Sequence, residues 1–406
     1  MKFTLRAKTH SLKGSIDLPA SKSISNRVLI IQALAQKPFK IENLSKADDT
    51  IIMQQALERN DLITDVGPAG TAMRFLTAYY ASQPGEKILT GSDRMKERPI
   101  KILVDALRDL GASITYLEKE GYPPLHIEGR RLQGGTVKVA GNISSQFITA
   151  LMLVGPTLPQ PLIIEIQGDS LSRPYIKMTQ SLMESCGAQV KIESDRIEIK
   201  PGRYRSNGYY VEQDWSAAAF WMAFASLARK SNLVLKNLTD KSIQGDRAAL
   251  DLFAQFGIKG QFTEAGLEVT KGGSKQEHIE WNFRNHPDLV QPAAFAAAAS
   301  QIKFMFNGLD NLRLKETDRI SALQNELAKL GTFCRVMGHS MEIEPTQRPE
   351  SIEPIETYSD HRMAMSAACL SLVVNELTIL DPMVVSKSYP GFWSQVEKYV
   401  DLKPGK

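Results

Sequence analysis

The chain has 406 residues, of which 43% are hydrophobic and 23% charged, and its formal net charge is +4. This is the composition of a globular protein long enough for two domains, and so small a net charge gives no indication of nucleic-acid binding. The first ten residues lack the apolar core of a signal peptide, and no run approaches the roughly 18 apolar residues of a membrane span, so we expect a cytoplasmic protein without a membrane partner.

The cysteines and histidines exclude two further kinds of site. Cys186, Cys334 and Cys369 are scattered in apolar or helical contexts, which is typical of core packing. The sequence does not cluster His, Cys and carboxylate residues at the spacing of metal ligands. We therefore expect neither structural disulfides nor a metal site.

Two kinds of helix alternate along the chain. The first is rich in Ala and other apolar residues, and the second is more amphipathic and often ends at Gly. The starts of the first kind are marked at Ser25, Thr71, Ser145, Ser216, Asp288 and His361, and those of the second kind at Asp49, Arg98, Arg173, Arg247, Arg319 and Tyr389. By subtraction, successive marks of the first kind are 71 to 74 residues apart, except for the first two, which are 46 apart.

Short β-like segments lie between these helices, among them Thr136–Val139, Leu162–Ile166, Gln189–Ile192, Ile197–Ile199 and Leu233–Leu235. The sequence therefore predicts an α/β protein of six repeats, each about 72 residues long with two helices and several strands. Three repeats make a domain, and we place the domains at 20–212 and at 1–19 together with 213–406. The first repeat is shortened in its strands after Leu57.

Polar motifs gather at the starts of the helices, where free N–H groups and the macrodipole attract anions. The densest is NLRLKETDR at 311–319, which sets three cations around Glu316 and Asp318 in the predicted first turn of an amphipathic helix. Cations that surround an acid indicate an anionic ligand and proton transfer to it. A solvated helix start with local ion pairs has the same pattern.

Other helix starts carry weaker motifs of the same kind. They are LPASKSISNR at 18–27, GPAGTAMR at 67–74, RMKERP at 94–99, SSQ at 144–146, SRPY at 172–175, HPD at 286–288, SDHRMAM at 359–365 and SKSYP at 386–390. Each alone is equally typical of a helix cap, a tight turn or a solvated surface. The glycine-rich motif also lacks the Gly-Lys-Ser/Thr of a nucleotide P-loop.

Taken together and in this order, the motifs LPxSKSxSNR, AGTAMR, RMKERP, SSQF, KETDR and DHRMAM resemble the 5-enolpyruvylshikimate-3-phosphate synthase family over nearly the whole chain. The resemblance implies the two-domain enolpyruvyl transferase fold, an inside-out α/β barrel of six β-α-β-α-β-β repeats. It also implies transfer of the enolpyruvyl group of phosphoenolpyruvate to the 5-hydroxyl of shikimate 3-phosphate, with release of phosphate, in chorismate and aromatic amino-acid biosynthesis. We expect a monomer and a glyphosate target, with no cofactor and no nucleic-acid partner.

The resemblance also implies roles by motif position. Phosphoenolpyruvate is bound by Lys22, Gly70, Arg98, Gln146, Arg319, Arg362 and Lys387. Shikimate 3-phosphate is bound by Lys22, Ser23, Arg27, Ser144, Ser145, Gln146, Ser172, Tyr175, Asp288, Asn311 and Lys315. Lys and Arg suit this task because both substrates carry a phosphate and a carboxylate, which repel each other.

Three residues are expected to be catalytic. The carboxylates are Asp288, which we place at the 5-hydroxyl as base, and Glu316, which we place at the methylene carbon. Lys22 is a competing proton donor, because a Lys among cations can have a lowered pKa.

Two residues depart from the family's pattern. Pro68 replaces a usual Asn and Phe75 a usual Pro, and both flank the turn expected to bind phosphoenolpyruvate, so affinity for that substrate and for glyphosate is open. The nearest alternative is UDP-N-acetylglucosamine enolpyruvyl transferase, whose reactive Cys has no counterpart in Arg94–Pro99. A nucleic-acid-processing protein of the same repeat fold is disfavoured by the modest charge and few aromatic residues. Retention of both carboxylates and all the cations disfavours an inactive relative.

Overall fold

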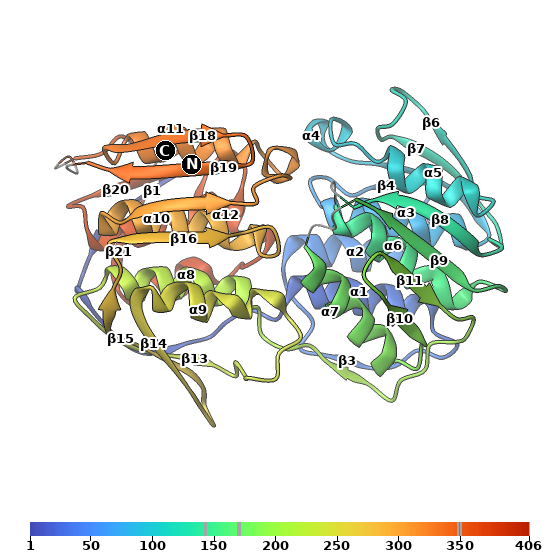
Figure 1. Ribbon diagram of the computed structural model, residues 1–406, viewed down its shortest axis with the longest axis horizontal. Helices are drawn as coiled ribbons and strands as arrows, with labels where there is room; N and C mark the ends of the chain where they lie inside the picture. The colour runs from blue at the N-terminus through green and yellow to red at the C-terminus, as the bar shows by residue number, and fades with distance from the viewer. Residues whose placement is uncertain (142–143, 169–171, 347–348, 350, 406) are drawn as a thin grey trace. The chain divides into compact units, whose positions relative to one another are not determined.

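The computed structural model describes residues 1–141, 144–168, 172–346, 349 and 351–405 (Figure 1). The chain divides into two compact units. Unit 1 comprises Met1–Pro19 and Glu212–Lys406, and unit 2 comprises Ala20–Val211. The chain therefore crosses twice between the units, near Pro19 and near Val211.

Unit 2 contains two four-stranded sheets and one two-stranded sheet. Their orders are β4-β5-β7-β6, β10-β11-β9-β8 and β12-β3. The strands are β3 (Ile41–Glu42), β4 (Ile63–Asp65), β5 (Gly85–Thr90), β6 (Ser113–Tyr116), β7 (Leu125–Gly129), β8 (Gly135–Ala140), β9 (Leu162–Gln167), β10 (Val190–Ile192), β11 (Arg196–Ile199) and β12 (Tyr209–Tyr210). The helices are α1 (Lys22–Leu34), α2 (Asp48–Glu58), α3 (Gly70–Ser82), α4 (Asp93–Lys96), α5 (Lys101–Asp109), α6 (Ser145–Val154), the 3-10 turn η1 (Gly155–Thr157) and α7 (Arg173–Ser185).

Unit 1 contains two four-stranded sheets and one three-stranded sheet. Their orders are β14-β15-β13-β2, β16-β17-β19-β18 and β20-β1-β21. The strands are β1 (Lys2–Ala7), β2 (Ser11–Ile16), β13 (Lys230–Lys236), β14 (Phe256–Thr263), β15 (Gly266–Lys275), β16 (His278–Asn282), β17 (Lys303–Asn307), β18 (Thr332–Met337), β19 (Ser340–Pro345), β20 (Leu377–Leu380) and β21 (Val400–Gly405). The helices are α8 (Trp215–Leu227), α9 (Ala249–Ala254), α10 (Val290–Ser300), α11 (Arg319–Ala328), α12 (His361–Ala368) and α13 (Phe392–Val396). The 3-10 turns are η2 (Gly245–Ala248), η3 (Pro287–Leu289), η4 (Leu312–Leu314), η5 (Cys369–Leu372) and η6 (Pro382–Lys387).

The helices of the first kind form the interior, and the sheets lie outside them. Every residue of α12, and every residue of α10 except Ser300, is buried. Strand β13 instead alternates exposed or partly exposed residues with buried ones, as expected of a sheet with one face in the core. Ala-rich sequences suit the interior helices because small side chains let neighbouring helices approach closely, and each buried large apolar side chain adds about 1.5–3 kcal/mol.

The predicted repeat is visible in the sheets. In each four-stranded sheet the first strand pairs parallel with the second, the second pairs antiparallel with the fourth, and the fourth pairs antiparallel with the third, as in β8, β9, β11 and β10. The last repeat includes β1 from the start of the chain, since β1 pairs antiparallel with both β20 and β21. The prediction of an α/β protein built from β-α-β-α-β-β repeats is confirmed.

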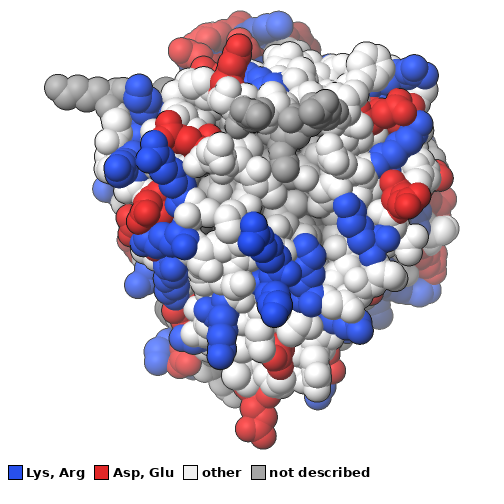
Figure 2. Space-filling view, turned by 90° about the vertical axis from the view of Figure 1, so that its left-hand side faces the viewer, with Lys and Arg blue, Asp and Glu red and all other residues white. Residues whose placement is uncertain are grey.

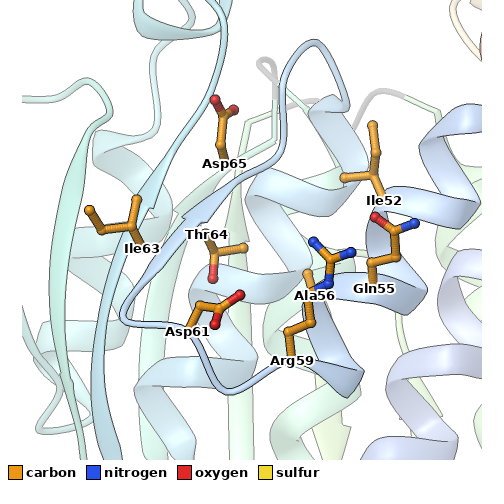
Figure 3. Close-up of a pocket in the computed structure, with 8 residues that line it drawn as sticks. All are labelled: Ile52, Gln55, Ala56, Arg59, Asp61, Ile63, Thr64 and Asp65. Carbon is orange, nitrogen blue, oxygen red and sulfur yellow. The ribbon is translucent and has the colours of Figure 1, made fainter.

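The first repeat is shortened where the sequence predicted. It has only the parallel pair β12 and β3, and the chain passes from the end of α2 at Glu58 to β4 at Ile63 without two further strands. A pocket opens beside this junction (Figure 3). Its lining residues are Ile52, Gln55, Ala56, Arg59, Asp61, Ile63, Thr64 and Asp65, and none of them is a predicted site residue.

Two marked helix starts lie three residues before the helix in the structure: α5 begins at Lys101 rather than Arg98, and α13 begins at Phe392 rather than Tyr389. The residues before α5 include a separate short helix, α4, whose N-cap Ser92 accepts from the Met95 N–H. The cations of the 311–319 motif do not form a first helical turn either. Leu312–Leu314 is a 3-10 turn, and α11 begins only at Arg319.

The described residues include no helix long and apolar enough to cross a membrane. Within the same residues there is no group of three or more His, Cys, Asp and Glu that could hold a metal ion. Figure 2 shows one face of the molecule, where Lys and Arg side chains lie among uncharged residues and Asp and Glu side chains.

Candidate active site

Arg319 is the centre of a buried charge network in unit 1. Its side chain is only 1% exposed, and three carboxylates surround the guanidinium. Nε donates to Asp360 Oδ2 at 2.8 Å, Nη1 to Asp288 Oδ1 at 3.1 Å and Nη2 to Glu316 Oε2 at 3.0 Å. Burial alone would lower the pKa of Arg319, but the three carboxylates outweigh it and raise the pKa, so the guanidinium is charged.

The local sequence explains where Arg319 lies. The side chain of Asp318 accepts from the N–H groups of Ile320 and Ser321 at 3.1 and 3.2 Å, which makes Asp318 the N-cap of α11. Arg313 donates to the other oxygen of Asp318 at 2.6 Å. Arg313 and Asp318 therefore form a local ion pair that fixes the helix start.

Asp288, on the turn η3, is shared between two arginines. Arg362 Nη2 donates to Asp288 Oδ2 at 2.7 Å, while Arg319 binds Oδ1. Burial would raise the pKa of Asp288, but the charges of Arg362, Lys315 and Arg319 together hold it below its usual range. Asp288 is therefore ionised at neutral pH, as a proton acceptor must be.

Glu316 lies between two cations in the loop before α11. One oxygen accepts from Arg319, and the other lies 3.6 Å from Lys387 Nζ. Lys387 is the last residue of η6 and is 5% exposed. Two more predicted residues flank η4, with Asn311 buried before it and Lys315 directly after it.

Asp360 was not assigned a role from the sequence, although it is fully buried in this network. Its Oδ2 accepts from Arg319, and its Oδ1 accepts from the Arg362 N–H at 2.9 Å as the N-cap of α12. The Asp-His-Arg motif carried a usable signal, because Asp two residues before a helical Arg is a typical capping position.

Arg27 is the corresponding buried cation of unit 2. It is held by neutral groups: Nε donates to Thr179 Oγ1 at 2.8 Å, Nη1 to the Ser23 carbonyl at 2.8 Å and Nη2 to Thr149 Oγ1 at 3.5 Å. Burial lowers the pKa of Arg27 to about 10, so the guanidinium stays charged at neutral pH. Its Cζ lies 5.4 Å from the ring centre of Phe75 and 6.0 Å from that of Tyr175.

Lys22 is the first residue of α1 and is paired with an acid that the sequence interpretation overlooked. Its Nζ lies 2.9 Å from Asp49 Oδ2, and both side chains are largely buried. Asp49 belongs to the first turn of α2, where a carboxylate is favoured by the helix dipole. The structure thus places a carboxylate beside Lys22, where the sequence interpretation expected cations.

Gly70 opens α3 directly against Arg98. A Cβ on Gly70 would lie 2.6 Å from Arg98 Nη1, so the absence of a side chain is required for this approach. Arg74, buried on the same helix, donates to the Gly70 carbonyl at 3.3 Å and to the Pro99 carbonyl at 3.4 Å. Phe75 is buried, and Pro68 is exposed in the turn before the helix.

The remaining predicted residues of unit 2 lie at the starts of α6 and α7. Ser144 caps α6 by accepting from the Gln146 N–H at 3.3 Å, and Ser145 is buried beside it. The side chain of Gln146 donates to Thr71 at 3.2 Å, which brings the starts of α6 and α3 together. Ser172 precedes α7 in the left-handed region with φ of 56°.

The structure brings some of the predicted residues of each unit into direct contact. Five of them in unit 1 are linked by direct contacts: Asp288, Glu316, Arg319, Arg362 and Lys387. In unit 2, direct contacts link Arg27 to Ser23 and Tyr175, and Gly70 to Arg98. Cations at helix starts in this arrangement are typical of α/β proteins that bind small anions.

Comparison with known proteins identifies the family. The family model described as EPSP synthase (3-phosphoshikimate 1-carboxyvinyltransferase) matches residues 7–59 and 53–396. A 3-phosphoshikimate 1-carboxyvinyltransferase of Bacteroides fragilis is 44% identical over 401 residues, 98% of each chain, and one of Histophilus somni is 37% identical over 420 residues, 95% of this chain and 96% of the other. The solved EPSP synthase of Acinetobacter baumannii covers 99% of this chain and 100% of its own at a TM-score of 0.79 and 21% identity, which supports the fold.

The chain belongs to the EPSP synthase family of 3-phosphoshikimate 1-carboxyvinyltransferases. The two stretches matched by the family model meet at residues 53–59, which include the end of α2. The break in the match therefore falls where the first repeat is shortened.

Proposed function

We propose that this chain transfers the enolpyruvyl group of phosphoenolpyruvate to the 5-hydroxyl of shikimate 3-phosphate and releases phosphate. Membership of the family supports the reaction. The observation that carries the assignment to particular residues is the network around Arg319. Asp288 and Glu316 bind its guanidinium directly, and these two acids in turn contact Arg362 and Lys387.

The proposed binding residues divide between the two ligands. For phosphoenolpyruvate they are Lys22, Gly70, Arg98, Gln146, Arg319, Arg362 and Lys387. For shikimate 3-phosphate they are Lys22, Ser23, Arg27, Ser144, Ser145, Gln146, Ser172, Tyr175, Asp288, Asn311 and Lys315. The burial of Arg27, Arg98 and Arg319 supports these roles, because a largely desolvated guanidinium interacts strongly with a phosphate or carboxylate.

Asp288 is the proposed base for the 5-hydroxyl. In the free protein Arg362 and Arg319 stabilise its charge and lower its pKa. An anionic ligand bound to these arginines would offset part of their positive charge and raise the basicity of Asp288. The base would thus become effective when the substrates are bound.

Glu316 is the proposed group at the methylene carbon, where the addition step needs a proton and the elimination step removes one. Its two oxygens contact Arg319 and Lys387, which hold the carboxylate in a fixed position and so support a role as acceptor in the elimination. Lys22 remains the competing donor for the addition. No metal or organic cofactor takes part in this scheme.

We also propose the finer assignments that accompany this function. The two domains are 20–212 and 1–19 with 213–406, each of three repeats, and the chain acts as a cytoplasmic monomer without a nucleic-acid partner. Light scattering of the purified protein tests the monomer.

The decisive experiment mixes the purified protein with phosphoenolpyruvate and shikimate 3-phosphate and measures phosphate release. Release that requires both substrates supports the proposal. Absence of release, together with reaction of a UDP-sugar or RNA substrate, would contradict it.

A further inference from the structure

The chain enters the Asp360–Arg362 motif through two strained residues. Tyr358 and Ser359 both have φ of 53°, in the left-handed region that disfavours side chains. They are the only neighbouring pair of non-glycine residues with positive φ among the described residues. Strain of this kind persists only where the surrounding structure enforces it.

Glu326 supplies the contacts that enforce it. Its carboxylate is fully buried, yet it takes no part in the Arg319 network. Oε1 accepts from the Tyr358 hydroxyl at 2.7 Å, and Oε2 accepts from the Glu356 N–H at 3.1 Å and from Lys329 Nζ at 2.7 Å. Burial and this hydrogen bond raise the pKa of Tyr358 to about 12, so the phenol keeps its proton at neutral pH.

Two more residues at the end of α11, Asn325 and the C-cap residue Lys329, contact the same segment. Lys329 Nζ also donates to the Pro354 carbonyl at 2.7 Å, and the Asn325 amide to the Tyr358 hydroxyl at 3.4 Å. Arg319, seven residues before Glu326 and therefore on the same face of the helix, binds Asp360. One helix thus contacts the segment on both sides of the strained pair.

We propose that Glu326 is a positioning residue, which holds residues 354–359 against α11. The left-handed conformation of Tyr358 and Ser359 then places Asp360 beside Arg319 and orients Arg362. Glu326 itself touches no proposed substrate position. The consequence for catalysis rests on the proposed roles of Arg319 and Arg362 in binding phosphoenolpyruvate.

Ser359 offers a test without loss of packing, because its side chain is exposed. A β-branched residue at positive φ is strongly disfavoured, whereas Gly adopts this conformation readily. We expect Ser359→Val to raise the KM for phosphoenolpyruvate by about tenfold, with kcat and the KM for shikimate 3-phosphate changed less than about twofold. Ser359→Gly should stay within about twofold of the unchanged protein in all three.

Glu326→Gln tests the carboxylate itself. It should raise the same KM by about tenfold or more, since it weakens charge-assisted hydrogen bonds. The matched control is Glu342→Gln on β19, which removes another partly buried ion pair of unit 1, with Lys303 at 3.0 Å, away from the segment. The control should leave all three constants unchanged.

A readout independent of activity separates this inference from the proposed function. The Arg362 N–H donates to Asp360, so hydrogen exchange at this amide should accelerate in Ser359→Val and Glu326→Gln but not in the two controls. Equal KM values in Ser359→Val and Ser359→Gly, or unchanged exchange at Arg362, would overturn the positioning role. Absence of phosphate release by the unchanged protein would instead contradict the proposed function, and the exchange measurement would still test the positioning role of Glu326.

Discussion

The two units hold their central arginines in opposite ways. In unit 1, Arg319 is surrounded by Asp288, Glu316 and Asp360. In unit 2, Arg27 is held by two threonine hydroxyls and a carbonyl, and two aromatic rings lie close to its guanidinium. Carboxylates orient a buried guanidinium while offsetting its charge, whereas hydroxyls orient it and leave its charge for a ligand.

This difference matches the roles proposed for Arg27 and for the acids beside Arg319. Binding the phosphate of shikimate 3-phosphate requires positive charge that is not already offset, which suits Arg27. Proton transfer requires acids at fixed positions beside cations, which suits the Arg319 network. The predictions below test this contrast, from the largest expected effect to the smallest.

Removal of the two arginines should have unequal effects on stability. Arg319→Ala leaves the buried Asp360 and the partly buried Asp288 and Glu316 without their shared cation, and we expect the free energy of unfolding to fall by about 3–5 kcal/mol with loss of activity. Arg27→Ala leaves only neutral groups unsatisfied and should cost about 1–3 kcal/mol. Denaturant unfolding of both variants measures the difference, and a larger loss in Arg27→Ala would contradict the contrast.

Substitutions of two acids of unit 1 should affect different kinetic constants, because we expect Glu316 to react and Asp360 to position Arg319. Glu316→Gln should bind both substrates and lower kcat by about 10²–10⁴, since the amide cannot exchange a proton. Asp360→Asn should act mainly on the KM for phosphoenolpyruvate, because Asp360 contacts only Arg319 and the start of α12 through the bonds described above. Steady-state kinetics decide, and near-normal kcat in Glu316→Gln would transfer the proton role to Lys22.

Gly70→Ala should disturb unit 2 with a smaller effect. The new Cβ would lie 2.6 Å from the flexible end of Arg98, so we expect the guanidinium to move and the KM for phosphoenolpyruvate to rise about tenfold. If glyphosate competes with phosphoenolpyruvate in the unchanged protein, as the sequence resemblance leads us to expect, its inhibition constant should rise as well. Gly202→Ala is the control, because a Cβ there meets no atom closer than 3.9 Å.

Substitution of Asp246 should have the smallest effect, a change in how the stability of the fold depends on pH. Burial, and next the charge of Asp288, raise the pKa of this carboxyl to about 7, while Ser216 donates a hydrogen bond to it. Because the folded state binds the proton more tightly, its contribution to stability is full below about pH 4 and is lost as pH rises through about 7. The gain in Tm from Asp246→Asn should therefore grow between pH 5 and 8, whereas exposed Asp251→Asn should show no such trend.

Much of the fold could be predicted from the sequence, because the repeat leaves a periodic signal. Starts spaced 71 to 74 residues apart gave the six repeats, and the single interval of 46 gave the shortened first repeat. Four glycines that follow amphipathic helices in the sequence, Gly111, Gly187, Gly257 and Gly331, all have positive φ, although Gly257 already lies within β14 rather than at a helix end. These features depend on residues close together in the chain.

Helix boundaries were predicted less well where one cap competes with another. The cations of the 311–319 motif were expected within a helical turn, but the Asp318 side chain binds the first N–H groups and so excludes the preceding residues from α11. The helix marked at Arg98 begins only at Lys101, and no side chain caps its start. Sequence alone does not show which of two nearby capping residues is used.

The sequence by itself determined the repeat, the class of the elements and the cations that recur at helix starts. Only the tertiary structure decided which acid meets which cation. Asp49 pairs with Lys22 across 27 residues, Asp360 pairs with Arg319 across 41, and Glu326 binds Tyr358 across 32. The physical reason is that a charge's pKa and orientation depend on burial and on partners brought together by packing, which leave no local pattern in the chain.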